Sequence, residues 1–263
     1  MELELAGKHV LVTGASKGIG LATVKAFLAE GAAVTAVSRR STPELDATGA
    51  TFVSADLSTV GGPRQMVETV LATEPRLDVL VNNAGGGDLQ DGVLEDPFGG
   101  DDDAWDQTFA LNLYAAVRAT RAALPALTEA RGAVVNVGSD STQQPHTNPL
   151  PYPTAKAALN AFSRGLAEKV AGSGVRVNVV TPGSTRTNIV VGEDGFVAQV
   201  AAAMGVEHSA LLADLTRQNG QITGELIDPT EIARMIVLLS SPTMPSAVGS
   251  NWALHAGALK MPS

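Results

Sequence analysis

Short, almost continuously apolar runs alternate with longer, alanine-rich stretches over the whole length of this chain. The apolar runs predict strands at residues 9–14, 33–38, 51–56, 78–83, 133–138, 175–181 and, more weakly, 247–255. Strands this apolar are typical of a parallel sheet, because helices then cover both of its faces. The intervening stretches predict helices at residues 18–30, 62–74, 103–129, 154–171 and 229–240. The alternation predicts one doubly wound α/β domain over residues 1–263.

The composition narrows the classes of protein to which this chain can belong. Hydrophobic residues make up 44% of the 263 residues and charged residues 17%, which is typical of a compact globular protein. The net charge of −9 and the lack of basic runs argue against nucleic-acid binding. The chain has no cysteine, which excludes disulfides and fits a reducing compartment. The first residues do not resemble a signal peptide and no apolar run is long enough to span a membrane, so we expect a cytoplasmic protein.

Two segments interrupt the alternation. Residues 86–103, GGDLQDGVLEDPFGGDDD, are rich in glycine and acidic residues. We interpret them as a long solvated turn, although such a loop can also shape a site entrance or a subunit contact. Residues 184–225 contain helical pieces at 196–204 and 209–216 but no strand. Because open α/β sheets bind ligands at the carboxyl ends of their strands, we expect residues 184–225 to form a substrate-covering lid.

The stretch VTGASKGIG (12–20) joins the first predicted strand to the first predicted helix. Its glycines, Gly14, Gly18 and Gly20, permit a tight turn and let a pyrophosphate approach the N-terminus of the helix. Such spacings also arise by chance in a chain with 27 glycines. The position between a strand and a helix is nevertheless where a dinucleotide binds, so the loop indicates a dinucleotide site.

The residues at the end of the second strand predict which dinucleotide binds. A site that selects NAD(H) usually has an acidic residue here, whereas this chain has Ser38, Arg39 and Arg40. Arg39 can form charge-assisted hydrogen bonds with a 2′-phosphate, and Lys17 adds a second positive charge from the glycine loop. Either residue alone is more simply an exposed basic side chain. Together they favour NADP(H), while NAD(H) remains open.

The stretch PYPTAKAA (151–158) places a tyrosine between two prolines at the start of a predicted helix. Proline suits the first turn of a helix, where its missing N–H group is not needed. A spacing of four residues puts Tyr152 and Lys156 on the same helix face, about one turn apart. The local sequence alone allows both a simple helix start and a pair of residues placed for chemistry.

Several motifs occur in a fixed order along the chain, namely TGASKGIG, NNAG, Asn112 in LNL, Ser139 in VNVGS, Tyr152 and Lys156 in YPTAK, and Pro182–Gly183 in TPG. In this order they resemble the short-chain dehydrogenase/reductase family over essentially the whole chain. The resemblance implies a Rossmann-like, doubly wound sheet of seven mostly parallel strands flanked by helices. It also implies an oxidoreductase that moves a hydride between NADP(H) and a carbonyl or secondary alcohol, such as a 3-oxoacyl-type ketoreductase.

The resemblance implies roles for four catalytic residues. Tyr152 is the general acid/base, with a usual pKa of about 10, so its ionisation near neutrality requires roughly 4 kcal/mol of help. Lys156 and the oxidised nicotinamide are expected to supply that help by charge, and Lys156 also binds the nicotinamide ribose. Ser139 binds the reacting oxygen, and we prefer it to Ser141 because it directly ends the strand. Asn112 holds a water for proton relay, unless it is a structural amide.

The resemblance also implies which residues contact the cofactor. Asp56 is placed to bind the adenine amino group, and Thr187 with the backbone of Pro182–Gly183 to bind the nicotinamide carboxamide. The full set is Gly14, Ser16, Lys17, Gly18, Ile19, Gly20, Ser38, Arg39, Asp56, Leu57, Asn83, Ala84, Gly85, Tyr152, Lys156, Pro182, Gly183, Thr185 and Thr187.

The lid is largely apolar, with Phe196, Val197, Val200, Met204, Leu211, Leu212 and Leu215. These residues suit a substrate with a hydrophobic part, although we favour packing of the lid against the body for most of them. His146 lies between Ser139 and Tyr152 and is a candidate substrate contact. The four histidines are scattered, so we predict no metal. The C-terminal Leu254–Gly257 stands where the family has V-D-G-G, which is a departure from the pattern.

The partner that we expect is a small carbonyl or alcohol substrate, with no nucleic acid and no membrane. By resemblance alone we expect a homotetramer, or a homodimer, that forms through the helices at 103–129 and 154–171. Two other functions remain open, an NAD(H)-dependent alcohol dehydrogenase and a non-catalytic dinucleotide-binding regulator. The substrate and the direction of the reaction cannot be predicted, because specificity depends on the lid.

Overall fold

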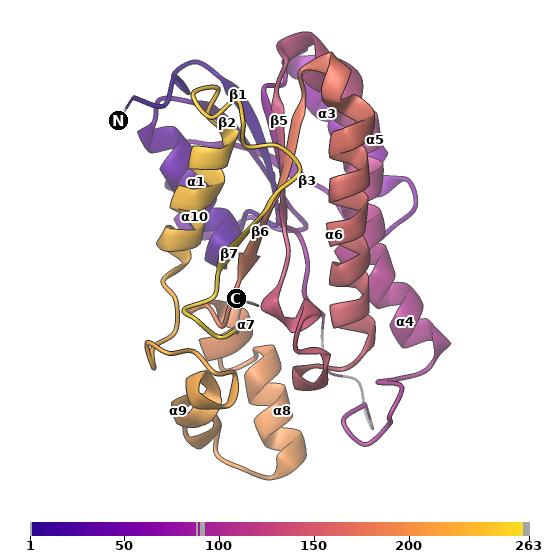
Figure 1. Cartoon of the computed structure of the whole chain (residues 1–263), viewed down its shortest axis with the longest axis vertical. Coiled ribbons are helices and arrows are strands. Elements are labelled where there is room, and N and C mark those ends of the chain that lie inside the picture. Colours follow the sequence, from indigo (N-terminus) through magenta and orange to yellow (C-terminus); the bar gives the residue numbers. More distant parts are fainter. Residues whose placement is uncertain (1, 88, 90–92, 260–263) are drawn as a thin grey trace.

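One parallel sheet forms the centre of the molecule in the computed structural model, which describes residues 2–87, 89 and 93–259 (Figure 1). The strands are β1 (His9–Thr13), β2 (Ala33–Ser38), β3 (Thr51–Ser54), β4 (Val79–Asn82), β5 (Ala133–Val137), β6 (Arg176–Pro182) and β7 (Asn251–Leu254). Their order is β3-β2-β1-β4-β5-β6-β7, and every neighbouring pair is parallel. The predicted doubly wound α/β fold is confirmed.

Helices cover both faces of the sheet. One face carries α1 (Gly18–Ala29) and α10 (Pro229–Ser240), and the other carries α3 (Gly62–Thr73), α5 (Ala115–Ala130) and α6 (Pro151–Val170) (Figure 1). The short helices of the body are α2 (Pro43–Asp46), η2 (Asp140–Thr142), η3 (Pro145–Thr147) and η4 (Ala171–Ser173).

Two hydrophobic cores explain why the strands are apolar on both sides. Successive side chains of a strand point to opposite faces of the sheet. Val10 and Val12 therefore pack into the core under α1 and α10, and Leu11 between them packs into the core under α3 and α5. All three are fully buried. A strand with two covered faces has no solvent-exposed face, which is why the runs show no regular alternation of apolar and polar residues.

The helical stretch predicted at 103–129 is confirmed, but its middle is not α-helical. The segment forms α4 (Asp102–Phe109), then a π-helical turn, η1 (Ala110–Tyr114), and then α5. In the turn the N–H of Ala115 donates to the carbonyl of Ala110, five residues back. Such turns frequently occur at functional sites, and Asn112 lies at the centre of this one.

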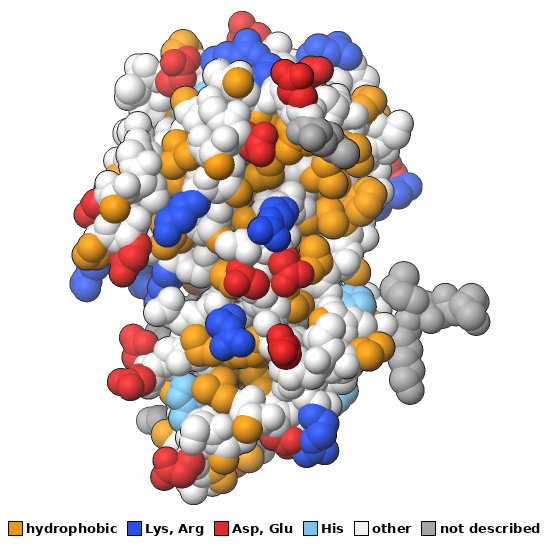
Figure 2. All heavy atoms as spheres, turned by 90° about the vertical axis from the view of Figure 1, so that its left-hand side faces the viewer, with side chains coloured by type: hydrophobic (Ala, Val, Ile, Leu, Met, Phe, Trp, Pro, Cys, Tyr) orange, Lys and Arg blue, Asp and Glu red, His pale blue; other side chains and the backbone are white. Residues whose placement is uncertain are grey.

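The predicted lid hangs from the carboxyl edge of the sheet (Figure 1). It contains α7 (Asn188–Val191), α8 (Phe196–Met204) and α9 (His208–Gln218). A parallel bridge between Thr185 and Ile227 ties its two ends together. Figure 2 shows the lid below the body from the α1 and α10 side, with acidic and basic side chains interspersed over this face.

Our interpretation of residues 86–103 as a solvated turn is incomplete. Residues 88 and 90–92 of this loop lie outside the described residues. Asp96 accepts hydrogen bonds from the N–H groups of Phe98 and Gly100, and Asp101 caps α4 by accepting from Ala104 N at 2.9 Å. Two of the acidic side chains therefore hold the local backbone rather than only facing water.

No single described helix is long and apolar enough to cross a membrane. One pair, 188–204 with 208–218, passes by length and composition but is bent by 102°.

Candidate active site

The glycine loop packs tightly against the end of β4. Gly14 has φ +65°, and a Cβ atom there would lie 2.9 Å from Ala84 Cα and from Asn83 Nδ2. A Cβ atom at Gly20 would lie 2.2 Å from the carbonyl oxygen of Gly14. Two of the three glycines are therefore required by contacts inside the protein. Gly20, which we expected at the cofactor, is buried and does not line the cleft.

The N-terminus of α1 is free to bind an anion. The helix begins at Gly18, and the preceding Lys17 makes no side-chain capping hydrogen bond. The first turn also contains no acidic residue. The first N–H groups of a helix have no partner within the helix, so this end attracts a negatively charged group such as a pyrophosphate.

Basic side chains lie beside this helix end. Lys17, Arg39 and Arg40 are exposed and line the same cleft. No described acidic side chain forms an ion pair with any of the three. The backbone under Arg39 is held by Ser54 Oγ, which donates to the Arg39 carbonyl at 3.0 Å. Three positive charges without an ion-pair partner among the described residues thus lie where the second strand meets the glycine loop.

Asp56 follows the carboxyl end of β3, next to the end of β2 that Arg39 follows, as predicted. Its Oδ1 atom accepts hydrogen bonds from Ser58 N at 3.0 Å and Ser58 Oγ at 2.6 Å. These bonds lower the pKa of Asp56, and the charge of Arg39 adds to the effect. The Oδ2 atom is the one left for an adenine amino group.

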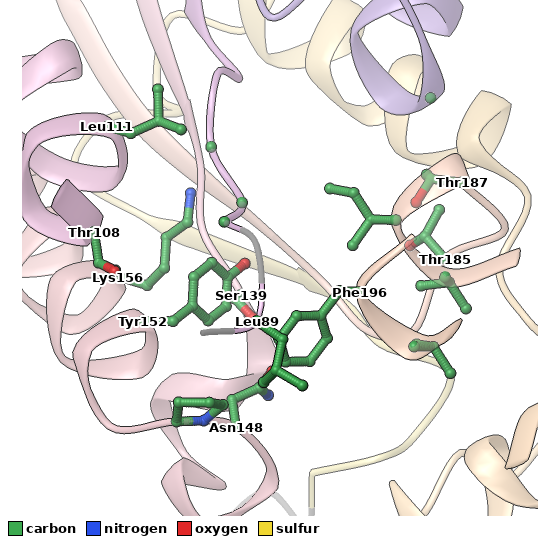
Figure 3. Close-up of a pocket in the computed structure, with 18 of the residues that line it drawn as sticks. Leu89, Thr108, Leu111, Ser139, Asn148, Tyr152, Lys156, Thr185, Thr187 and Phe196 are labelled. Carbon is green, nitrogen blue, oxygen red and sulfur yellow. The ribbon is translucent and has the colours of Figure 1, made fainter. Parts of the chain in front are cut away.

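Tyr152 and Lys156 lie one turn apart on α6, which begins at Pro151. Lys156 is only 4% exposed, and its Nζ atom donates to the carbonyl of Val137 at 2.9 Å. The same atom lies 5.9 Å from the centre of the Tyr152 ring. In Figure 3 the hydroxyl group of Tyr152 points toward Ser139, and the Lys156 amine points away from the lid.

Burial shifts the pKa values of both residues. Burial lowers the pKa of Lys156 to about 8. Burial raises the pKa of Tyr152; the neighbouring Ser139 hydroxyl opposes this, and the charge of Asp140 reinforces it. Our expectation that Lys156 and the oxidised nicotinamide together favour the ionised tyrosine stays a prediction.

The structure separates the two candidate serines. Ser139 lines the cleft, whereas Ser141 is buried and donates its backbone N–H to Ser139 Oγ at 3.2 Å. The two hydroxyl oxygens lie 2.8 Å apart. Ser141 thus supports the position of the Ser139 hydroxyl, and Ser139 is the serine that faces the cleft.

Asn112 is buried, and its side chain is engaged by the protein. Its Oδ1 atom accepts from Gly86 N at 2.9 Å, and its Nδ2 atom donates to Gly86 O at 2.8 Å and Thr108 O at 2.9 Å. These bonds support the alternative of a structural amide, because the side chain clamps the chain after β4, and the role of Asn112 in holding a water stays a prediction. A Cβ atom at Gly85 would lie 2.9 Å from Asn112 Oδ1 and 3.1 Å from Lys156 Nζ, so these two side chains meet beside Gly85.

One cleft of about 1580 Å³ connects these groups. It extends from Lys17 and Arg39 past Ser139, Tyr152 and Lys156 to the lid. Every predicted cofactor residue lines it except Gly20. The predicted lid residues that line it are Phe196, Val197, Val200, Met204, Leu211 and Leu215. Lining the cleft does not exclude packing against the body, so our preference for packing of the lid against the body stays a prediction.

Two residues near the reacting groups escaped the sequence reasoning. Asp140 lines the cleft directly after Ser139, and burial raises its pKa to about 6 although the charge of His255 lowers it. His255 is 8% exposed, and neither of its ring nitrogens has a hydrogen-bond partner among the described residues. His146 lines the cleft, as we predicted. A carboxylate adjacent to a candidate catalytic serine was the signal that could have drawn attention to Asp140.

The described residues contain no group of three His, Asp or Glu side chains that could hold a metal ion. The absence of a metal stays a prediction.

Comparison with known proteins places the chain in a family. Residues 8–194 match the model of the short chain dehydrogenase family. The chain is 33% identical to the uncharacterized oxidoreductase YvrD of Bacillus subtilis, over 99% of each chain. It is 36% identical to the 2,3-dihydro-2,3-dihydroxybenzoate dehydrogenase of Escherichia coli, over 91% of this chain and 92% of that one. The L-sorbose reductase of Gluconobacter frateurii, solved with NADPH and L-sorbose, is 28% identical and superposes over 100% of both chains with a TM-score of 0.87. The chain therefore belongs to the short chain dehydrogenase family and is an NAD(P)-dependent oxidoreductase that acts on CH–OH groups.

Proposed function

We propose that this oxidoreductase uses NADPH to reduce a ketone that carries a hydrophobic group. The observation that carries the proposal is one continuous cleft that has the positive charges of Lys17, Arg39 and Arg40 at one end. The Ser139, Tyr152 and Lys156 side chains lie in its middle, and an apolar lid closes the other end. The charges suit a 2′-phosphate, the three polar side chains suit a carbonyl oxygen, and the lid suits the rest of the substrate.

The cofactor fits the residues present. The uncapped N-terminus of α1 would hold the pyrophosphate, and Arg39 with Lys17 would hold the 2′-phosphate. Lys156 uses one N–H to fix itself to Val137 O, which leaves two for the nicotinamide ribose and a water. Thr187 and the backbone of Pro182–Gly183 would bind the carboxamide. When bound, the nicotinamide supplies the hydride.

Tyr152 acts as the proton donor in this proposal. Its hydroxyl and that of Ser139 hydrogen-bond the substrate oxygen, and the phenolic O–H bond breaks as the alcohol O–H bond forms. The phenol is protonated at neutral pH, as donation of a proton to the substrate oxygen requires, and burial raises its pKa further. Lys156 then returns a proton to the phenolate, and its lowered pKa makes that donation easier. A water on the π-helical turn that contains Asn112 would link Lys156 to solvent.

The comparisons support the coarse part of this proposal. The sorbose reductase is similar over its full length and was solved with NADPH and a ketose, which favours reduction of a ketone with NADPH here. The narrower idea of a 3-oxoacyl-type reductase stays a prediction. So do the two alternatives, an NAD(H)-dependent alcohol dehydrogenase and a non-catalytic dinucleotide-binding regulator.

The test is a panel of ketones with NADPH or NADH, in which loss of reduced cofactor is followed by absorbance. We expect turnover that is faster with NADPH and that falls at least a hundredfold in Tyr152→Phe, because the proton donor is lost. Equal or better rates with NADH would overturn the cofactor choice. Unchanged turnover in Tyr152→Phe would overturn the assignment of Tyr152.

The homotetramer, or homodimer, through α5 and α6 and the cytoplasmic location also stay predictions. Light scattering on the purified protein measures the oligomeric state directly.

A further inference from the structure

A chain of hydrogen bonds between buried side chains joins β4, β5 and α6. Asn82 Nδ2 donates to Asn136 Oδ1 at 2.8 Å, and Asn136 Nδ2 donates to Ser163 Oγ at 2.7 Å. Ser163 Oγ donates in turn to the carbonyl of Leu159, one turn earlier on α6, at 2.6 Å. None of the three polar side chains is more than 4% exposed. Polar groups are costly to bury, but a buried network whose members are bonded to one another fixes a single arrangement of the elements that carry them.

The sheet holds Asn136 in one orientation. Asn82 and Asn136 lie directly opposite each other on β4 and β5. Asn82 Nδ2 also donates to Thr120 Oγ1 on α5 at 2.9 Å, so both of its N–H groups are used. Because the amide oxygen of Asn136 accepts from Asn82, its amide nitrogen is the atom that faces α6. The sheet therefore offers a fixed donor to Ser163.

Ser163 and Lys156 are the polar residues that α6 buries. The other buried residues of this helix are apolar, namely Pro151, Pro153, Ala155, Leu159, Ala167 and Val170. Apolar contacts are not directional, so they hold α6 on the sheet without fixing its position along β5. Among the described residues, two hydrogen bonds join α6 to β5. One runs from Lys156 Nζ to the carbonyl of Val137, and the other runs from Asn136 to Ser163.

The two bonds hold α6 at two separate points. Ser163 comes seven residues after Lys156, which is about 10 Å along the helix axis. A helix held at one point can still tilt and slide, and in the proposed reaction the remaining N–H groups of Lys156 serve the ribose and a water. The second bond removes that freedom. Because Ser139 follows β5 and Tyr152 lies in the first turn of α6, the position of α6 along β5 sets how these two hydroxyl groups meet.

We propose that the hydrogen bond between Asn136 and Ser163 positions the reacting side chains of α6 against the oxygen that Ser139 binds. Those side chains are Tyr152 and Lys156. The inference rests on the proposed ketone reduction and adds two positioning residues to it, neither of which lines the cleft. A displacement of about 1 Å caused by a distant substitution can slow a reaction about a hundredfold. Loss of this bond should therefore slow the chemical step and leave cofactor binding intact.

The test replaces Ser163 by alanine and compares this variant with the same change at a matched serine. Ser240 on α10 is 3% exposed, and its hydroxyl donates to the carbonyl of Ile236, four residues back, at 2.8 Å. This is the same local bond that Ser163 makes to Leu159, but the Ser240 hydroxyl makes no other hydrogen bond among the described residues. Ser240→Ala therefore controls for the loss of a buried helical hydroxyl.

The measurement isolates the chemical step. Enzyme in excess over NADPH is mixed with the fastest ketone of the panel, and the single-turnover rate of NADPH oxidation excludes product release. We expect this rate to fall about tenfold in Ser163→Ala and to change by less than about twofold in Ser240→Ala. The Kd for NADPH should change by less than about twofold in both variants, because the phosphate-binding groups lie on α1 and after β2.

Conservative variants separate the hydrogen bond from the volume of the side chain. Ser163→Thr keeps the hydroxyl group and should retain at least about half of the wild-type rate. Ser163→Cys, a weaker acceptor of similar size, should fall between wild type and Ser163→Ala, and it replaces that variant in the comparison if the alanine protein does not fold. An unchanged rate in Ser163→Ala, or an equal loss in Ser240→Ala or Ser163→Thr, overturns the inference and leaves ketone reduction standing.

A wild-type enzyme that reduces none of the ketones overturns the proposed function instead. Crystal structures of the wild type and of Ser163→Ala then decide the inference. The first turn of α6 should move by about 0.5–1 Å relative to β5 in the variant. Superimposable positions of α6 in the two structures overturn it.

Discussion

Replacement of Lys156 by methionine should abolish turnover and make the protein more stable at neutral pH. Lys156 is 4% exposed, and burial lowers its pKa from 10.5 to about 8. A shift of this size corresponds to about 3 kcal/mol of unfavourable free energy for keeping the charged form in the folded state. The substitution also removes the hydrogen bond to Val137 O and leaves this buried carbonyl without a donor, which destabilises the variant by about 1–2 kcal/mol. We therefore expect Lys156→Met to be about 1–2 kcal/mol more stable than the wild type at pH 7.

The pH dependence gives a sharper test than the single value. Between about pH 8 and 10.5 the unfolded chain still binds the lysine proton and the folded chain does not. The wild type therefore gains stability as the pH rises through this window, and Lys156→Met does not. Denaturant titrations should show that the free energy of unfolding of Lys156→Met minus that of the wild type falls by about 2 kcal/mol between pH 7 and pH 9.5. Lys25→Met, on the exposed face of α1, is the control and should show no such change. A variant that is less stable than the wild type at pH 7 by the same amount as at pH 9.5 would refute the reasoning.

Three further substitutions test other parts of the structure. Arg39→Ala should raise the KM for NADPH about tenfold and leave that for NADH unchanged, because an exposed charge-assisted contact is lost; equal losses in steady-state assays would argue against a 2′-phosphate role. Gly20→Ala should destabilise the fold by more than about 3 kcal/mol, because its Cβ would lie 2.2 Å from Gly14 O, and a thermal melt measures this. Arg176→Leu should cost about 3 kcal/mol in denaturant titrations, because the buried guanidinium donates to carbonyls at the end of α10, including Leu239 O at 2.7 Å. Arg176→Lys should recover part of that loss, and no difference between the two variants would contradict the capping role.

The sequence was sufficient for the fold because each strand carries its own signal. The centre of the run HVLVT, Val10–Val12, is apolar on both sides, and the structure buries these three residues between two cores. The spacing of Tyr152 and Lys156 was equally local, since four residues make one helical turn. Both features are properties of a short stretch of chain, and neither depends on what packs against it later.

The features that were missed depend on contacts between distant residues. The π-helical turn at Asn112 goes with two hydrogen bonds to Gly86, which is 26 residues away in the sequence. Local helix propensity cannot predict a hydrogen-bond partner that is so far away in the sequence. We predicted Gly20 as a cofactor contact because of its place in the glycine loop. The atom that leaves no room for a side chain there, the carbonyl oxygen of Gly14, comes close to Gly20 only when the loop folds. Asp140 became notable only when the structure placed its carboxyl group in the cleft beside Ser139.

The strand order explains why motifs so far apart make one site. β1 lies between β2 and β4, so the chain leaves β1 toward one face of the sheet and leaves β4 toward the other. A crevice opens where the order reverses, and ligands bind there in sheets of this kind. Gly14, after β1, touches Ala84, after β4, at the floor of that crevice. The side chains of Asn112 and Lys156 meet beside Gly85, the residue after Ala84. Any side chain at Gly85 would therefore push these two side chains apart. The small residues of NNAG are thus needed first for the assembly of the catalytic groups, and the passage of a cofactor is a second consequence of the same geometry.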